Sequence, residues 1–171
     1  MPADDYLAKS PDASRIGKAV EHLVAATCIL ASGAQLNVST ALVDDEGVDL
    51  VFHRRGGSTT LAAQVKSRRT DTTGLQRGRF MASVRQQTFR PRPGLYLLFV
   101  VADAARATFG PVWLVPSAAF AEKARAVGAR GHLRFNASTL PDAHDQWRPY
   151  RCERAALPGK ILELLADTEA E

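Results

Sequence analysis

The 171-residue sequence predicts an α/β fold in which helices flank a mixed sheet, and three segments carry this prediction. Residues 13–31 place apolar side chains at helical spacing. Residues 50–65 form two strand-like runs around Gly56-Gly57, a pair typical of a two-residue hairpin turn. Residues 94–101 form a continuous apolar run, as expected for a central strand covered on both faces. The chain should therefore begin with a helix, continue with antiparallel strands and reach a buried strand.

The first helix is expected over residues 13–31, with Gly33 as its C-terminal stop. Its apolar stripe consists of Ile16, Val20, Leu23, Val24, Thr27 and Leu30. Glu21 lies off this stripe, and from spacing alone it is equally an exposed helical acid. Gly17, one turn earlier on the face of Glu21, would let another backbone or a nucleic-acid strand approach closely.

Strands and turns follow the helix. Residues 36–43 predict the first strand, and Asp44-Asp45-Glu46-Gly47 predicts the turn into the second. Asp45 or Glu46 could help to attract a metal ion, although turn residues are the simpler interpretation. The second strand contains Leu50-Val51-Phe52 and the third runs from Thr59 to Val65.

The hairpin turn fixes which residues of the second and third strands face each other. Counting outward from Gly56-Gly57 pairs Asp49 with Gln64, whose Cβ atoms should lie about 5 Å apart. Lys66 is two residues farther on and shares the face of Gln64. A carboxylate, an amide and an ammonium group are therefore expected on one small patch of the sheet. The same three residues could also mark the solvated side of a hairpin.

The rest of the chain gives a mixture of strand and helix signals. Residues 70–78 predict a mobile loop, and residues 79–89 fit either a helix or an alternating strand. Further elements are strands at 112–115 and 132–135, a helix that Ser117 caps and that runs through Ala126, and a terminal helix at 158–166 in which Ile161, Leu162 and Leu165 pack on the sheet.

The segment Glu46-Gly47-Val48-Asp49, followed after about a dozen residues by Gln64-Val65-Lys66, resembles the PD-(D/E)XK nuclease superfamily. The resemblance is to the branch of type IV restriction endonucleases and archaeal Holliday-junction resolvases, and it covers roughly residues 14–101. In those proteins a helix carries a glutamate, the second strand starts with an aspartate, and an acidic residue or glutamine stands two residues before a lysine. Glu21, Asp49, Gln64 and Lys66 match these positions. Val48 replaces the motif proline, and Gln64 is neutral.

This resemblance implies a restriction-endonuclease-like core: a helix, a three-stranded antiparallel meander, a crossover, and further strands with flanking helices. Because that topology has a crossover after the third strand, we expect residues 79–89 to be helical. The core would span about 14–116, with C-terminal additions at about 117–168, in a single nuclease-like domain over residues 1–171.

The resemblance also implies a metal-dependent endonuclease that hydrolyses phosphodiester bonds, most often in DNA. Asp49 would be the principal Mg²⁺ or Mn²⁺ ligand, joined by the Gln64 side-chain oxygen and the Val65 carbonyl. Glu21 would bind metal through water or hold a second ion, and Lys66 would orient water or stabilise the transition state. The alternative is a catalytically inactive module of the same fold that binds nucleic acid or a protein partner.

Positive charge is concentrated in one part of the chain. Residues 54–92 contain ten Lys and Arg and a single acid, Asp71, so this segment has a net charge of +9 and the remainder has −5. Such clustering is typical of surfaces that contact phosphates. The residues predicted to bind nucleic acid are Arg54, Arg55, Arg68, Arg69, Arg77, Arg79 and Arg85.

Composition bounds the remaining possibilities. A hydrophobic content of 46% suffices for a core, and the N-terminal residues lack the features of a signal peptide, which predicts a cytoplasmic protein. No run of apolar residues is long enough for a transmembrane helix. Cys28 and Cys152 show no metal-ligand spacing and should be reduced thiols. Cleavage of both DNA strands by one such domain would need a homodimer or sequential nicking.

Overall fold

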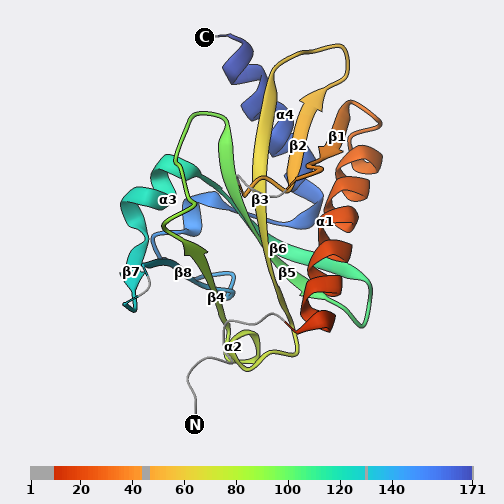
Figure 1. The fold of residues 1–171 in the computed structure, drawn as a ribbon. Helices are drawn as coiled ribbons and strands as arrows, with labels where there is room; N and C mark the ends of the chain where they lie inside the picture. The colour runs from red at the N-terminus through yellow and green to blue at the C-terminus, as the bar shows by residue number, and fades with distance from the viewer. Residues whose placement is uncertain (1–9, 44–46, 130, 171) are drawn as a thin grey trace.

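The computed structural model describes residues 10–43, 47–129 and 131–170, and it has two sheets packed face to face (Figure 1). Sheet A has six strands in the order β1-β2-β3-β5-β6-β9, and sheet B has three in the order β4-β8-β7. Helices α1 and α4 cover the face of sheet A that is turned away from sheet B. The chain therefore has the predicted α/β architecture, with a second sheet in addition.

The strands of sheet A are β1 (Leu36–Thr40), β2 (Leu50–Arg54), β3 (Thr60–Arg69), β5 (Leu95–Asp103), β6 (Thr108–Pro116) and β9 (Arg151–Cys152). Those of sheet B are β4 (Arg79–Arg85), β7 (Arg125–Val127) and β8 (His132–Ser138). The helices are α1 (Pro11–Ala31), α2 (Thr73–Gln76), α3 (Ser117–Lys123) and α4 (Leu157–Glu169), with short 3-10 turns at Arg148–Tyr150 and Arg154–Ala156.

Helix α1 begins and ends close to the predicted positions. The Ser10 hydroxyl accepts a hydrogen bond from the Ala13 N–H at 3.1 Å, and Pro11 occupies the first turn, where its missing N–H costs nothing. Val20, Val24 and Cys28 recur every four residues and are buried against sheet A. Gly33 follows the last turn with a φ of 60°, as a glycine stop requires.

The predicted meander is present, and its register is the predicted one. β1, β2 and β3 are antiparallel, and Leu50 lies opposite Ala63 while His53 lies opposite Thr60. The turn itself differs from the expected two-glycine turn: the Gly57 N–H donates to the Arg54 carbonyl at 2.9 Å, and only Gly56 has a positive φ. The loop extends symmetrically around the same centre, and this is why the counted register still holds.

The expectation of a helix at residues 79–89 is wrong, because β4 occupies residues 79–85. Its side chains alternate between buried and exposed, and its partner β8 lies more than 40 residues later in the chain. β3 and β5 are parallel, so the connection between them passes through α2 and sheet B instead of a crossover helix. The predicted loop at 70–78 contains the single turn of α2.

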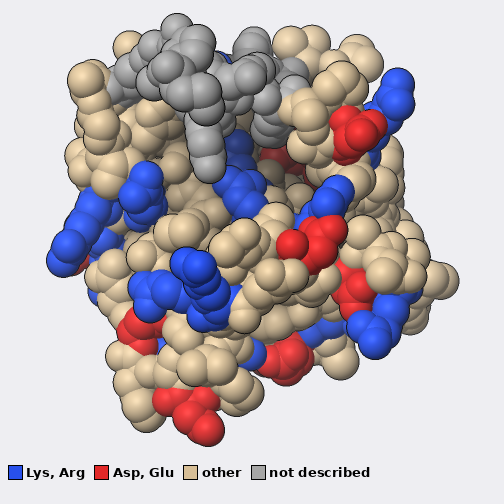
Figure 2. All heavy atoms as spheres, turned by 90° about the horizontal axis from the view of Figure 1, so that it is seen from below, with Lys and Arg blue, Asp and Glu red and all other residues tan. Residues whose placement is uncertain are grey.

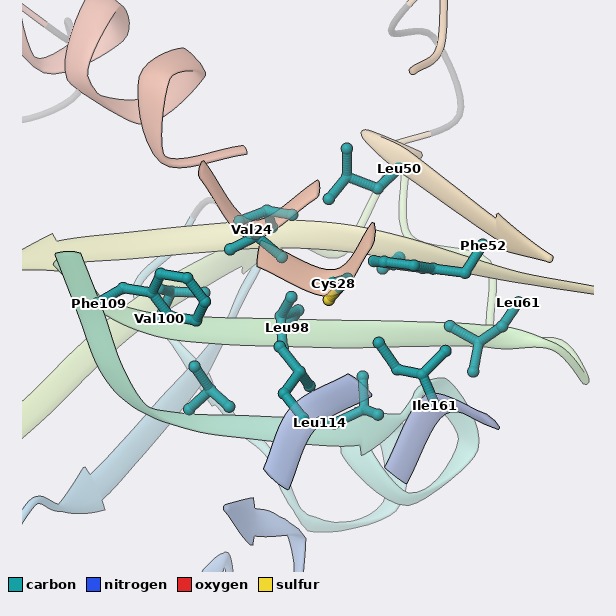
Figure 3. Packing of buried hydrophobic residues seen from close by; sticks show 14 of the residues in the cluster. Val24, Cys28, Leu50, Phe52, Leu61, Leu98, Val100, Phe109, Leu114 and Ile161 are labelled. Carbon is teal, nitrogen blue, oxygen red and sulfur yellow. The ribbon is translucent and has the colours of Figure 1, made fainter. Parts of the chain in front are cut away.

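Sheet A has a separate hydrophobic core on each face. The core under α1 and α4 is mainly aliphatic, with Phe52 and Phe109 among residues such as Val24, Leu98 and Ile161 (Figure 3). The core between sheets A and B is aromatic: the rings of Phe99 and Phe135 stack with centroids 3.7 Å apart. These rings fix sheet B on sheet A.

The C-terminal part completes both sheets. β8 and β7 belong to sheet B, β9 adds an edge strand to sheet A, and α4 buries Ile161 and Leu165 as predicted. The predicted cap at Ser117 is wrong, because Ser117 is already inside α3 and is 1% exposed. Its hydroxyl donates to the Arg92 carbonyl at 2.9 Å, and α3 ends three residues before Ala126.

Candidate functional site

Asp49, Gln64 and Lys66 come together at the place where β2 begins. Continuing the β2–β3 register by one residue from Leu50 and Ala63 puts Asp49 opposite Gln64, and the Asp49 N–H donates to the Ala63 carbonyl at 2.9 Å. Strand β3 continues through Lys66 to Arg69, beyond the start of β2. This end of β3 therefore has β5 on one side and no β2 residue on the other.

Alternation along β3 separates the polar residues from the core. Leu61, Ala63 and Val65 are buried under the helices, so Gln64 and Lys66 face the other side of the sheet. Both are partly buried. Asp49 precedes Leu50, which is buried under the helices opposite Ala63, and so lies on the Gln64 side. The sheet itself thus gathers the three groups.

The Asp49 carboxylate binds the edge of β3 just beyond the start of β2. Its Oδ2 accepts a hydrogen bond from the Val65 N–H at 2.6 Å, in the position where a β2 residue would continue the ladder. The N–H and C=O of one extended residue point to the same side of the strand, so the Val65 carbonyl lies on the same edge as the Asp49 carboxylate. A carboxylate and a carbonyl oxygen therefore lie together beside Gln64.

Gly47 closes over the Gln64 side chain. Its φ is 70°, and a Cβ built there would lie only 2.8 Å from the Gln64 Nε2. Such a contact excludes any side chain at position 47 unless Gln64 moves. The sequence marked Gly47 only as a turn residue, because nothing in its spacing reveals which side chain lies beneath the turn. Asp44, Asp45 and Glu46, the other residues of that predicted turn, lie outside the described residues.

Glu21 approaches from a different layer. It belongs to α1, on the face of sheet A opposite to Gln64 and Lys66, and its side chain is 13% exposed. It accepts a hydrogen bond from the Lys18 Nζ at 2.6 Å, one turn earlier on the same helix. The contacts of the described residues connect Glu21 to its own helix and do not join it to Gln64.

The predicted nucleic-acid-binding arginines separate into groups. Arg54 and Arg55 lie at the hairpin turn, beside the paired residues His53 and Thr60. Lys66 is six residues beyond Thr60 on β3, which places it roughly 20 Å from the turn. Arg68 and Arg69 lie at the site end of β3, and the remaining three lie on or near sheet B: Arg77, Arg79 and Arg85. Figure 2 views the molecule from the α2 end and shows basic groups interspersed with acidic ones.

The two arginines at the end of β3 differ in environment. Arg69 binds Asp71 through two hydrogen bonds of 2.6 and 2.9 Å, and this guanidinium holds the pKa of the Asp71 carboxyl below its usual range. Burial lowers the pKa of Arg68, whose Nη1 donates to the Ser67 carbonyl at 2.8 Å. Arg69 thus keeps a solvent-accessible charge, and Arg68 is partly buried.

The donor atoms of the site suit a hard divalent cation. Within the described part of the chain, no three His, Cys, Asp or Glu side chains cluster as a metal site. Among the described residues, the oxygens beside Gln64 are one carboxylate, one backbone carbonyl and the amide oxygen itself. Magnesium is commonly held by one or two carboxylates, with water and substrate oxygens completing its shell. The group fits Mg²⁺ or Mn²⁺ better than zinc, whose protein sites are built mainly from Cys and His ligands.

Comparison with known proteins gives a match in fold. No family model matches the chain, and no curated protein matches it in sequence. Among solved structures, a bacterial homing endonuclease, I-Ssp6803I, superposes with a TM-score of 0.55 at 17% identity, over 96% of this chain and 100% of the other. The chain shares its α/β fold with an endonuclease.

This likeness covers both sheets and nearly the whole length of the chain. It concerns the fold, and the chemistry has to be argued from the site. The PD-(D/E)XK assignment, with its restriction-endonuclease-like topology, therefore remains a prediction. No helix among the described residues is long and apolar enough to cross a membrane.

Proposed function

We propose that this protein is a metal-dependent nuclease that hydrolyses phosphodiester bonds in DNA. The observation that carries the proposal is the placement of Asp49 opposite Gln64, with its carboxylate on the Val65 backbone and Lys66 on the same face of β3. An oxygen-rich edge beside a cationic side chain suits the binding of a metal ion and a phosphate together. The endonuclease fold of the structural neighbour supports the same function.

Asp49, Gln64 and the Val65 carbonyl would hold the Mg²⁺ or Mn²⁺ ion. The role expected for Glu21 stays a prediction, because its described contact is to Lys18 of its own helix. The bound ion would lower the pKa of a water molecule and neutralise charge on the phosphate. The Val65 N–H orients the Asp49 carboxylate by a charge-assisted hydrogen bond, so this ligand is positioned before substrate arrives. Gly47 leaves room for the Gln64 amide and closes it off on one side.

Lys66 would act on the reacting phosphate. Its ammonium group supplies positive charge on the face that carries Gln64, where negative charge develops on the phosphate oxygens during attack by water. Arg69 would contact a neighbouring phosphate, for which it has to exchange its exposed ion pair with Asp71. Such exposed pairs contribute little free energy, so the exchange is inexpensive.

One observation favours the alternative, an inactive module that binds nucleic acid or a protein partner. The described residues supply only one carboxylate to the β2–β3 patch, because Gln64 is neutral and Glu21 is bound to Lys18 on the opposite face. A site with a single negative charge holds a divalent cation less tightly than one with two. This alternative predicts DNA binding without cleavage.

Three substitutions separate the two functions. Asp49→Asn keeps an oxygen for the Val65 N–H and removes the charge, so metal binding and cleavage should both be lost while the fold is retained. Lys66→Ala should leave metal and DNA affinity nearly unchanged and lower the single-turnover cleavage rate about 100-fold or more. Gln64→Glu restores a second carboxylate and should raise metal affinity. Lys160→Ala, an exposed lysine on α4, is the matched control.

Cleavage would be measured on duplex, branched and single-stranded DNA and on RNA, with Mg²⁺ and with Mn²⁺, and metal affinity by calorimetry. If neither the wild-type protein nor Gln64→Glu cleaves any of these substrates, the module is the correct function. If Lys66→Ala instead loses DNA affinity and retains its cleavage rate at saturating DNA, Lys66 is a binding residue and the role assigned to it is wrong.

A further inference from the structure

The outward side of sheet B is basic and carries no acid. In β4 and β8 the buried residues alternate with residues that point away from sheet A. No Asp or Glu occupies an outward position of β4, β7 or β8. We define the basic face by six outward residues: Arg79, Ser83, Arg85, Arg125, Arg134 and Asn136.

Two arginines face each other on this surface. Arg125 of β7 lies directly opposite Arg134 of β8, and both are exposed. Like charges in directly opposed positions of a sheet are destabilising. Among the ion pairs of the described residues, none involves either arginine. An unfavourable local arrangement that no neighbouring residue compensates is expected mainly at functional sites. A polyanionic partner would compensate this pair.

The composition of the face identifies the kind of polyanion. Proteins that bind single-stranded nucleic acid stack bases on exposed aromatic rings. Here the two phenylalanines of β4 and β8, Phe80 and Phe135, are 0% exposed and face the core, and the three strands contain no Tyr or Trp. Most outward side chains are instead arginine, asparagine and serine, which hydrogen-bond base edges and phosphates; Met81, His132 and Val127 share this side of the sheet.

The shape of the face points to the major groove. The DNA major groove is about 12 Å wide and admits a two-stranded β-ribbon, whereas the major groove of duplex RNA is too narrow to be read. β4 and β8 form an antiparallel pair over seven residues each, from Arg79 opposite Ser138 to Arg85 opposite His132. β7 pairs only with residues 132–134 of β8, so the remainder of the pair is a two-stranded ribbon. The Arg79 Nη2 and Nε donate to the Asn136 Oδ1 at 2.9 and 3.2 Å, which aligns two side chains that read bases.

We propose that the basic face docks into the major groove of duplex DNA and supplies the recognition surface of this protein. The proposal rests on the proposed nuclease function for its substrate class. β4 follows β3 through the short α2 segment, and the two strands are in contact, so DNA held on sheet B is close to the end of β3. The sheet would thus provide specificity without a separate recognition domain.

The test is DNA binding with cleavage prevented. Fluorescence anisotropy with a labelled random-sequence duplex, in EDTA and over a series of salt concentrations, gives the slope of log affinity against log salt. In the double variant Arg125→Ala/Arg134→Ala the slope should be smaller in magnitude by about two, with a tenfold or greater loss of affinity at low salt. The matched control is Arg55→Ala/Lys160→Ala, which removes two exposed charges from the hairpin turn and from α4 and should change neither quantity.

Several outcomes would overturn the proposal. These are an unchanged slope in Arg125→Ala/Arg134→Ala, no duplex binding by the wild-type protein, or equal competition by single-stranded DNA or anionic vesicles. Loss of folding is excluded by thermal melting, because removing an opposed pair of like charges should not lower the melting temperature.

A parallel cleavage assay with Mg²⁺ tests the nuclease function separately. Salt-dependent duplex binding through Arg125 and Arg134 without cleavage would support the basic face and contradict the nuclease. Cleavage with an unchanged salt slope in the double variant would support the nuclease and contradict the basic face as the DNA-binding surface.

Discussion

Asp49 has two roles that follow from one position. Its carboxylate takes the place of a missing strand partner for Val65, and the same group lies where the proposed metal ion would bind. Structural and chemical roles of this kind are normally difficult to separate by mutation. Asparagine separates them, because it retains the hydrogen-bond acceptor and lacks the charge.

Gly47→Ala should impair the site more than the fold. Alanine at a φ of 70° costs about 1–2 kcal/mol of stability, and its Cβ would displace the Gln64 amide, which lies 2.8 Å from that position. We expect lower metal affinity, measured by calorimetry, and slower cleavage. Urea unfolding of the same samples gives the accompanying change in stability.

Gly33→Ala is the matched control for this prediction. Gly33 has a φ of 60°, and nothing described lies within 4 Å of a Cβ built there. Alanine should therefore cost a similar free energy of unfolding while metal affinity and cleavage stay at the wild-type level. Equal cleavage by the two variants would show that Gly47 does not position Gln64.

At the scale of elements, the extra length of β3 decides which basic residues can serve the site. The strand runs on from Gln64 to Arg69 without β2, whereas Arg54 and Arg55 lie at the opposite end of the hairpin. The basic residues of segment 54–92 are continuous in sequence, but they lie in separate parts of the structure. A phosphate backbone bound at Lys66 therefore meets the end of β3 and not the turn.

Arg69→Ala should reduce the salt slope of DNA binding by about 0.9, the value for one phosphate contact. Arg55→Ala removes the same charge at the hairpin turn and should leave the slope unchanged. Asp71→Asn should strengthen binding, because it releases Arg69 from its ion pair. These slopes come from the anisotropy titrations described above. A larger effect of Arg55→Ala than of Arg69→Ala would place the phosphate backbone at the turn.

The sequence was sufficient for the meander and its register, because both depend on short-range signals. Turn glycines and alternating side chains lie within 20 residues of Asp49, so counting could align it with Gln64. β4 could not be predicted in this way. Its partner β8 follows more than 40 residues later, and only that pairing makes a strand of residues 79–85. The opposed Arg125 and Arg134 were missed for a different reason: a helix was expected through Ala126, so Arg125 was not recognised as part of a hairpin with β8.

At the scale of the whole molecule, the two cores give sheet A a different environment on each face. The helical side buries Cys28 completely, and this burial, with a smaller contribution from the nearby Cys152, raises the pKa of the Cys28 thiol to about 12. Burial likewise raises the pKa of Cys152 to about 11. Both thiols stay protonated at neutral pH, so neither is an activated nucleophile.

This shift predicts how stability depends on pH. The ordinary thiol pKa is 9.0, and the folded value is higher, so the folded state retains its proton while the unfolded state loses it. The contribution of Cys28 to stability is therefore complete below pH 9 and is lost as the pH rises toward 12. The stability difference between the wild type and Cys28→Ala should shrink between pH 8 and pH 10.5, as measured by urea unfolding. Parallel pH profiles of stability for the wild type and Cys28→Ala would contradict this prediction.

The alternation of β4 and β8 has an evolutionary consequence. Inward residues such as Phe80 and Phe135 hold the aromatic core, while each outward neighbour can be replaced without disturbing it. The β7–β8 hairpin is also contiguous in sequence and lies far along the chain from Asp49. If the basic face recognises DNA as proposed, a lineage could acquire a new target sequence by substitutions in this hairpin alone, and the proposed catalytic residues would be inherited unchanged. Libraries randomised at the outward positions of β4 and β8 would explore the same route in the laboratory.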